Sequence, residues 1–209
     1  SETKEHYIAL DFDFDKVGFD VTYLMDSVSS AIATPVYLYL VQRMRQCLDG
    51  RLTSFVIDEA WQLFASFFWE KCLKEWLPTI RKKNGHFIFM TQSPKTVTTS
   101  AIQHVVLDNL STMIVFPNSL ADRDTYIEHL KLTETQFQAV KDSTPESRIF
   151  LYKQENEAML CRLDLSALSD LIRVLSGNVK SVQLLDSIMT DVGTNPDVWL
   201  PIFLDRSGR

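Results

Sequence analysis

The sequence predicts an α/β fold with a mainly parallel sheet, flanking helices and a helical C-terminal tail. Three observations lead to this fold class. Short apolar runs at residues 55–57, 86–91 and 112–116 have the β-branched and aromatic composition of buried strands. Longer stretches in which apolar residues recur at helical spacing separate these runs. After residue 163 the patterns are helical throughout.

The composition is that of a folded domain without a general affinity for polyanions. The chain has 209 residues, of which 45% are hydrophobic and 23% charged, which is enough to build a core. Its net charge of −6 offers no basic surface for broad binding to DNA or to an anionic membrane. Three scattered cysteines without CxxC spacing favour neither a disulfide framework nor a zinc site. The cysteine pattern favours a reducing compartment. Because no apolar run approaches the ~20 residues of a membrane helix, we also expect a soluble chain.

The N-terminal part is predicted to enter the sheet and then form the first helix. Residues 17–25 have the composition of a strand. Pro35 suits the first turn of the helix that follows, since proline is tolerated there. Asp49-Gly50 is a typical helix stop before the strand at 55–57.

A second helical pattern covers residues 62–82. Pro78 should kink or end this helix, because proline has no backbone N–H to donate. The later expected elements are helices at 99–109, 120–130 and 133–141, a hairpin of 148–153 with 158–163, and tail helices starting near Ser166, Val179 and Asn195-Pro196. We therefore expect a sheet-containing part at residues 1–163 and a helical segment at 164–209 that packs on it.

Polar side chains end two neighbouring strands. The strand at 55–57 stops on Asp58 and Glu59, and the strand at 86–91 is followed by Gln92. The carboxyl ends of parallel strands form the ligand crevice of open α/β sheets. In nucleotide-hydrolysing folds such a strand supplies one acid that holds Mg²⁺, directly or through water, and a second that polarises the attacking water. The pattern predicts a Walker B strand with a catalytic glutamate; the alternative is a buried strand whose exposed end merely carries charges.

The chemistry of other enzyme classes is disfavoured by what the sequence lacks. None of the six glycines begins the GxxxxGK[ST] cradle that binds the phosphates of a nucleotide, so this chain is not expected to hold a triphosphate in the usual way. Asp58 and Glu59 are adjacent on a strand and point to opposite faces, which disfavours a glycosidase pair. No GxSxG element indicates a serine hydrolase.

An ordered set of motifs resembles the C-terminal ATPase domain of the type IV secretion ATPases, the VirB/TrbE/CagE family. The motifs are GFDVT (18–22), LDG (48–50), FVIDEAW (55–61), WLPTIRKKNG (76–85), TQSP (91–94), FPN (116–118), SRIFL (147–151) and VLSG (174–177). They extend over nearly the whole chain. The resemblance implies part of a RecA-like P-loop NTPase core whose P-loop lies upstream, with ATP and Mg²⁺ as cofactors.

The resemblance also implies roles for particular residues. Asp58 matches the Walker B acid that serves Mg²⁺, Glu59 the glutamate that activates water, Arg81 and Lys82 a basic nucleotide-binding motif, Gln92 a polar sensor, and Arg148 an arginine that approaches a neighbouring subunit's nucleotide. Taken without the resemblance, a basic cluster at a helix C-terminus is often only a solvated end, and a lone arginine only a surface residue.

The function implied by the resemblance is that of an ATPase that energises bacterial type IV secretion or conjugation. Such a protein would form a homo-oligomer with other secretion components at the cytoplasmic face of the inner membrane, its membrane association coming from other parts of the protein. Without a P-loop, the isolated chain is expected to be inactive. Two alternatives stay open: a catalytically inert interaction module of a secretion complex, and a related hexameric DNA translocase, which a basic pore loop would favour. A GxxxxGK[ST] motif upstream in the intact gene would favour the ATPase over the inert module.

Overall fold

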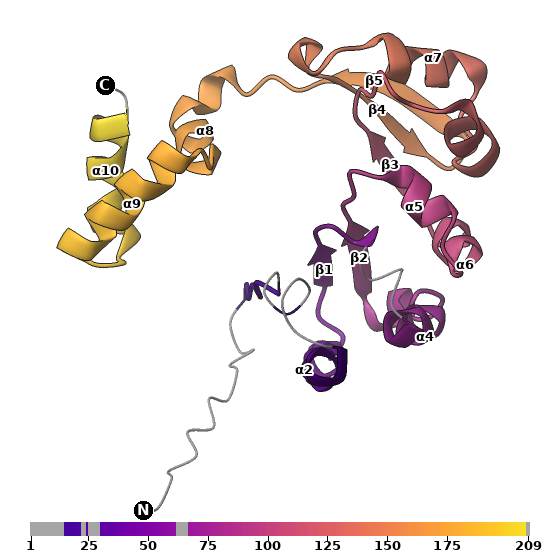
Figure 1. The fold of residues 1–209 in the computed structure, drawn as a ribbon, viewed down its shortest axis with the longest axis horizontal. Helices are drawn as coiled ribbons and strands as arrows, with labels where there is room; N and C mark the ends of the chain where they lie inside the picture. Colours follow the sequence, from indigo (N-terminus) through magenta and orange to yellow (C-terminus); the bar gives the residue numbers. More distant parts are fainter. Residues whose placement is uncertain (1–14, 22–23, 25–29, 62–66, 208–209) are drawn as a thin grey trace, which may run out of the picture. The chain divides into compact units, whose positions relative to one another are not determined.

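The computed structural model describes residues 15–21, 24, 30–61 and 67–207. The contacts divide the chain into two compact units, Ser1–Ser111 with Asp122–Glu134, and Thr112–Ala121 with Thr135–Arg209. Figure 1 shows the elements of both units coloured along the sequence. The predicted division at residue 163 stays a prediction.

A pair of parallel strands forms the centre of the first unit. β1 (Thr53–Ile57) and β2 (Gly85–Phe89) lie side by side, with Phe55 opposite Phe87 (Figure 1). Parallel neighbours cannot be joined by a tight turn and need a crossover connection. Here the crossover contains α4 (Phe67–Trp76) and the short 3₁₀ helix η1 (Ile80–Lys83).

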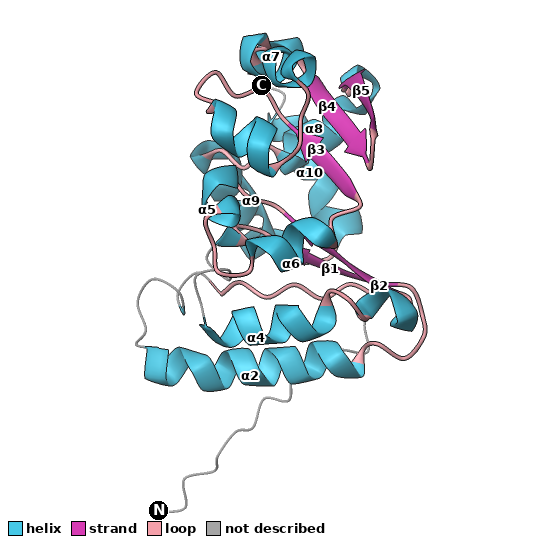
Figure 2. Ribbon diagram, turned by 90° about the vertical axis from the view of Figure 1, so that its right-hand side faces the viewer, coloured by secondary structure: helices cyan, strands magenta, loops and turns pink. Residues whose placement is uncertain are grey.

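Two helices lie beside each other below this pair of strands in Figure 2. α2 (Ser30–Gln46) and α4 pack through Val41, Trp69 and Trp76, which are all buried. α4 ends before Pro78, as the sequence predicted. The prediction for Pro35 was wrong, because α2 begins upstream and contains Pro35 in its interior, where one backbone hydrogen bond is lost.

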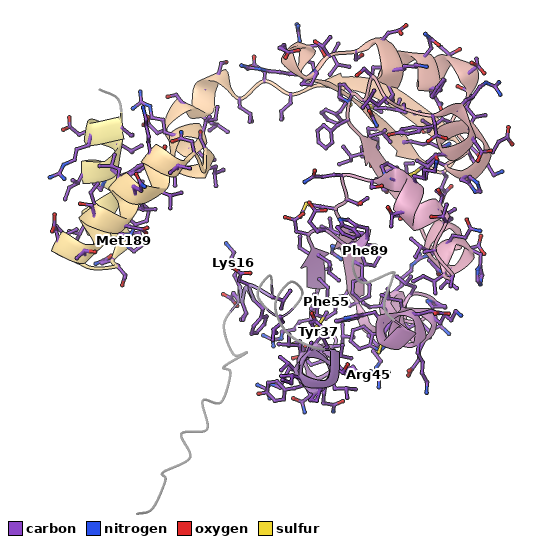
Figure 3. The ribbon with its side chains drawn as sticks, viewed as in Figure 1. Lys16, Tyr37, Arg45, Phe55, Phe89 and Met189 are labelled. Carbon is purple, nitrogen blue, oxygen red and sulfur yellow. The ribbon has the colours of Figure 1, made fainter. Side chains whose placement is uncertain are left out.

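Aromatic rings fill the space between the strands and the two helices. Phe87 lies 5.3 Å from Phe55 and 5.2 Å from Phe89, measured between ring centroids. Figure 3 labels Phe55 and Phe89 on the strands and Tyr37 on α2. Burial raises the pKa of the Tyr37 hydroxyl and of the Cys72 thiol, both of which pack against this core.

A second cluster in the same unit anchors the turn that follows β1. Ala60 and Leu73 are fully buried there with Ile102 and with Val106 of α6 (Gln103–Asp108). The unit also contains α5 (Pro94–Thr98) and η2 (Asp124–His129), a π-helical turn. Of the helix predicted at 99–109, the structure forms only the shorter α6, and α5 lies before that range.

The predicted strand at 17–25 is not present where it can be examined. Residues 17–21 form no regular element, and 22, 23 and 25 lie outside the described residues. Val17 and Phe19 are exposed, so this apolar run is not buried against a sheet. Its composition resembles that of a strand, but composition alone does not supply the neighbouring strand that must satisfy its backbone groups.

The second unit contains an antiparallel sheet of β3 (Thr112–Val115), β4 (Ile149–Gln154) and β5 (Glu157–Arg162), in that order. The hairpin of β4 and β5 confirms the prediction, since two residues are enough to join antiparallel strands. α7 (Glu134–Asp142) lies beside this sheet (Figure 1), and η3 (Pro145–Ser147) leads into β4. Among the described strands one pairing is parallel and two are antiparallel, so the expectation of a mainly parallel sheet was wrong.

Helices η4 (Ser166–Leu168), α8 (Ser169–Leu175), α9 (Val179–Val192) and α10 (Pro196–Ser207) form the C-terminal segment. α9 and α10 pack as an adjacent pair (Figure 1), in which Ile188 and Phe203 are almost fully buried. Arg173 of α8 donates from Nη1 to the Leu204 carbonyl oxygen, at 3.4 Å. The predicted helical tail is thus confirmed.

Candidate functional site

The structure brings Asp58, Glu59 and Gln92 together. β1 and β2 end opposite each other at Ile57 and Phe89, so the residues that follow both strands leave the sheet at one edge. The side-chain amide of Gln92 donates to Oε1 of Glu59, with 2.6 Å between nitrogen and oxygen. Two residues that are 33 positions apart in the sequence are thereby joined directly.

The backbone at Glu59 adopts a conformation that is unusual for a residue with a side chain. Its φ is +48°, in the left-handed region. Met90 N–H donates to the Ile57 carbonyl, and Ala60 N–H donates to the Met90 carbonyl, both at 2.9 Å. Glu59 N–H donates to Oδ1 of Asp58, also at 2.9 Å. These bonds and the buried Ala60 hold the turn in place from both sides.

Both oxygens of the Glu59 carboxylate accept hydrogen bonds from side chains. The indole N–H of Trp61 donates to Oε2 at 2.6 Å, while Gln92 donates to Oε1. Hydrogen bonds to a charged acceptor are shorter and stronger than those between neutral groups. Sequence reasoning did not single out Trp61, and no sequence pattern shows that a tryptophan two residues beyond a glutamate will turn back to it.

Asp58 has an exposed carboxylate, of which Oδ1 is engaged by the backbone of Glu59. A carboxylate offers about four lone-pair positions, so one such bond leaves room for a cation or for its water shell. Mg²⁺ keeps several waters and is usually bound by one or two carboxylates together with the phosphates of a substrate. The donor set at Asp58 fits that mode of binding.

Arg81 and Lys82 lie at the amino-terminal end of β2, whereas Asp58 and Gln92 lie at the carboxyl-terminal ends of the two strands. Arg81 and Lys82 belong to η1, which leads into the first residue of β2. A strand of five residues spans roughly 13–17 Å. Both side chains are exposed, and within one chain the structure does not bring them to Asp58.

A shallow hollow of about 200 Å³ lies beside η1, near the amino-terminal end of β2. It is lined by Arg45, Leu48, Glu75, Trp76, Thr79, Ile80 and Lys83. Arg45 pairs with Glu75 at 2.7 Å and its guanidinium lies 5.3 Å from the centroid of the Trp76 ring. The arginine that lines this hollow is therefore already engaged by groups of the same unit.

Arg148 belongs to the second unit. It precedes β4 with a φ of +54°, its N–H donates to the Pro145 carbonyl, and its own carbonyl accepts from Leu163 N–H at 2.9 Å. Its side chain is exposed. Hydrogen bonds from Ser166, together with the nearby charge of Arg148, hold the pKa of Asp164 below its ordinary value.

The chain is similar to several type IV secretion proteins. It is 38% identical over 198 residues to VirB4 of Bartonella henselae, a match that covers 94% of this chain and 25% of that protein. VirB4 of Brucella abortus is 37% identical over 194 residues (90% of this chain and 22% of that protein), and PtlC of Bordetella pertussis 33% over 192 residues (89% and 22%). No model of a protein family matches the chain.

A solved structure has a similar fold. The structure of VirB4 of Thermoanaerobacter pseudethanolicus matches with a TM-score of 0.56 and 17% identity, over 68% of this chain and 39% of that one. At this identity the match shows the fold alone. It supports a mixed arrangement of helices and strands that includes a small parallel sheet.

These matches place the chain among the type IV secretion proteins. More particularly, it belongs to the VirB4 family, which confirms the resemblance inferred from its motifs. The chain spans about a quarter of the length of the curated relatives it matches. None of the helices in the described ranges has the length and apolar character needed to cross a membrane.

Proposed function

We propose that this chain is the Walker B part of a RecA-like ATPase that energises type IV secretion or conjugation. The observation that carries the proposal is the convergence of Asp58, Glu59 and Gln92 at the carboxyl edge of a parallel strand pair. Ligands bind at this edge in open α/β sheets. The relatives at 33–38% identity are type IV secretion proteins, which supports the setting.

The three residues at this edge have complementary chemistry. Mg-ATP, when bound, supplies the phosphoryl group that is transferred to water. Asp58 would hold the Mg²⁺, directly or through water. Glu59 would orient the attacking water and accept a proton from it. Gln92 links the end of β2 to Glu59 through a hydrogen bond, and through this bond it would respond to a change at the nucleotide.

Arg81, Lys82 and Arg148 would act across a subunit interface. Arg81 and Lys82 lie at the edge of the strands away from Asp58, so nucleotide contact by them is best explained by a neighbouring copy of the chain. The side chain of Arg148 is exposed. Cations supplied by a neighbour stabilise the charge that develops on the transferred phosphoryl group. We therefore propose a homo-oligomer, working with other secretion components at the cytoplasmic face of the inner membrane.

The roles of the two carboxylates can be separated in the intact protein. Glu59→Gln should lower kcat by about 10²-fold or more while Mg-ATP stays bound, because the base is removed and the Mg²⁺ ligand is kept. Asp58→Asn should in addition weaken Mg-ATP binding, because the cation loses a charged ligand. Steady-state hydrolysis and equilibrium nucleotide binding measure the two effects.

Glu157→Gln is a suitable control, since Glu157 is an exposed glutamate at the start of β5. It should leave kcat and nucleotide binding unchanged. Equal and mild losses for Asp58→Asn and Glu59→Gln would show that the two acids are only the charged end of a strand.

A further inference from the structure

Trp61 is in direct contact with the proposed catalytic glutamate but has no part in the function proposed above. Its indole N–H lies 2.6 Å from Oε2 of Glu59, and the contact is partly buried. The indole nitrogen can only donate, so in this bond the carboxylate is always the acceptor. A partly buried bond to a charged oxygen is stronger than the same bond in water.

The two donors to Glu59 come from different parts of the chain. Trp61 follows β1 within the same turn as Glu59, whereas Gln92 follows β2. Gln92 is exposed, while Trp61 is partly buried. The support from Trp61 is therefore local and fixed, whereas that from Gln92 depends on how the ends of the two strands are placed.

Each carboxylate oxygen accepts more than one hydrogen bond. Glu59 can therefore keep its bond to Trp61 through Oε2 while Oε1 turns from Gln92 to a water molecule. A base must be held in the correct geometry to be effective, and a glutamate side chain has several rotatable bonds. Because Oε2 remains hydrogen-bonded to the indole N–H, the orientation of Oε1 stays restricted even when Gln92 no longer donates to it.

We propose that Trp61 is a positioning residue that orients Glu59 toward the attacking water through the indole N–H bond to Oε2. This inference rests on the proposed function and adds one residue to the same site. It requires that the donor, rather than the bulk of the ring, is what matters. The indole must therefore be replaced by rings that differ in the presence of that N–H.

Two substitutions in the intact protein make this comparison. Trp61→Phe keeps an aromatic ring but removes the donor, and should lower kcat about 10- to 100-fold with KM for Mg-ATP unchanged. Trp61→His should restore most of kcat, because Nε2 of histidine is two bonds from Cγ, as Nε1 of tryptophan is. If both variants lose activity equally, ring bulk decides and the proposal is wrong.

Trp199→Phe provides the matched control. The Trp199 indole N–H also donates a hydrogen bond, to the Thr194 carbonyl at 3.2 Å, but it does so within the C-terminal helical segment. Its replacement removes the same kind of bond from a place without Asp58 or Glu59. We expect kcat and KM to remain those of the unmodified protein.

A measurement without ATP tests the contact itself. Thermal unfolding of Trp61→Phe, Glu59→Ala and the double variant forms a double-mutant cycle. If the indole and the carboxylate interact, the double variant should lose less in Tm than the sum of the single losses. Additive losses would overturn the proposal, whatever the activity of the protein.

The result for Glu59→Gln separates the two proposals. If Glu59→Gln abolishes hydrolysis but Trp61→Phe retains full kcat, Trp61 does not position the base, and the proposed function stands. If Glu59→Gln hydrolyses ATP normally, the proposed function fails, and with it the positioning role of Trp61.

Discussion

Glu59 combines an unfavourable backbone conformation with a carboxylate that is held at both oxygens. A non-glycine residue in the left-handed region costs on the order of 1–3 kcal/mol, and such residues persist only where their surroundings fix them. Here the buried Ala60 and the backbone bonds to Met90 supply that support. The same turn therefore sets both the local strain and the direction of the carboxylate.

Gly85, the first residue of β2, lies in a closely packed position. It is buried, and a Cβ there would lie 2.7 Å from Cδ2 of Leu48 and 2.8 Å from Cγ1 of Ile80. Gly85→Ala should lower the free energy of unfolding by about 1–3 kcal/mol, because neighbouring side chains must move. Chemical denaturation of the isolated chain measures this change.

Gly177→Ala is the control for this substitution, since a Cβ at Gly177 meets no atom within 4 Å. The free energy of unfolding should change far less than for Gly85→Ala. Similar losses for the two variants would show that backbone conformation, and not crowding beside Leu48 and Ile80, determines the effect.

At the scale of elements, the parallel pairing of β1 and β2 decides which residues can share a site. Parallel strands begin at the same end of the sheet and finish at the other end. Residues before β2 and residues after it are therefore separated by the length of the strand. This is why Gln92 meets Glu59 and why Arg81 and Lys82 do not. The basic motif consequently requires a partner chain if it is to contact the same nucleotide.

Helix α9 begins with a side-chain cap that can be tested. Oδ1 of Asn178 accepts from the N–H of Ser181 at 2.9 Å, which satisfies one of the free donors at the helix start. Asn178→Ala should destabilise the chain by about 0.5–2 kcal/mol. Asn178→Ser should cost much less, because serine is also a favourable cap.

Thermal unfolding followed by circular dichroism at 222 nm measures this effect. Lys180→Ala serves as a control, since Lys180 is exposed in the same first turn and Ala favours helix. Equal stability of the alanine and serine variants at residue 178 would show that the cap contributes nothing measurable.

For the whole molecule, the first expectation concerns the isolated chain of 209 residues. In P-loop nucleotide hydrolases the P-loop supplies most contacts to the β- and γ-phosphates, and the 209-residue sequence contains no GxxxxGK[ST] motif. We expect the isolated chain neither to bind Mg-ATP tightly nor to hydrolyse it. Titration calorimetry that detects micromolar Mg-ATP binding would contradict the expectation that phosphate binding requires a P-loop, which these 209 residues lack.

The second expectation concerns Arg148 and its neighbour in an oligomer. Arg148→Ala should reduce hydrolysis by the assembled protein by ~10³-fold, the contribution that such an arginine makes in related chemistry. The fold and the affinity for ATP should be nearly unchanged. Mixing Arg148→Ala with Glu59→Gln subunits should restore part of the activity, because some interfaces then combine an intact Glu59 with an intact Arg148.

Arg206→Ala is the control for this experiment, because Arg206 is also exposed but lies in the C-terminal helix α10. Its activity should remain normal, alone or in mixtures. A mixture of Arg148→Ala and Glu59→Gln that stays inactive, although mixed oligomers form, would exclude an action of Arg148 across the interface.

Local chemistry in the sequence was sufficient for many elements. Pro78 follows the end of α4, α9 begins at Val179, and a polar turn joins β4 and β5 in a hairpin, because each depends on residues within a few positions of one another. The same holds for the strand that ends on Asp58 and Glu59. The convergence of these acids with Gln92 was also predictable, since it needs only two neighbouring parallel strands.

Only the tertiary structure decided the features that depend on distant or non-periodic contacts. The pairing of β3 with β4 is antiparallel, although an apolar strand has the same composition in either direction. Pro35 lies inside α2, where the surrounding helix outweighs one lost hydrogen bond. The bond from Trp61 to Glu59 depends on the left-handed turn at Glu59, which the pairing of Ala60 with Met90 fixes. Sequence periodicity encodes which residues are buried, but not how a turn directs an individual side chain.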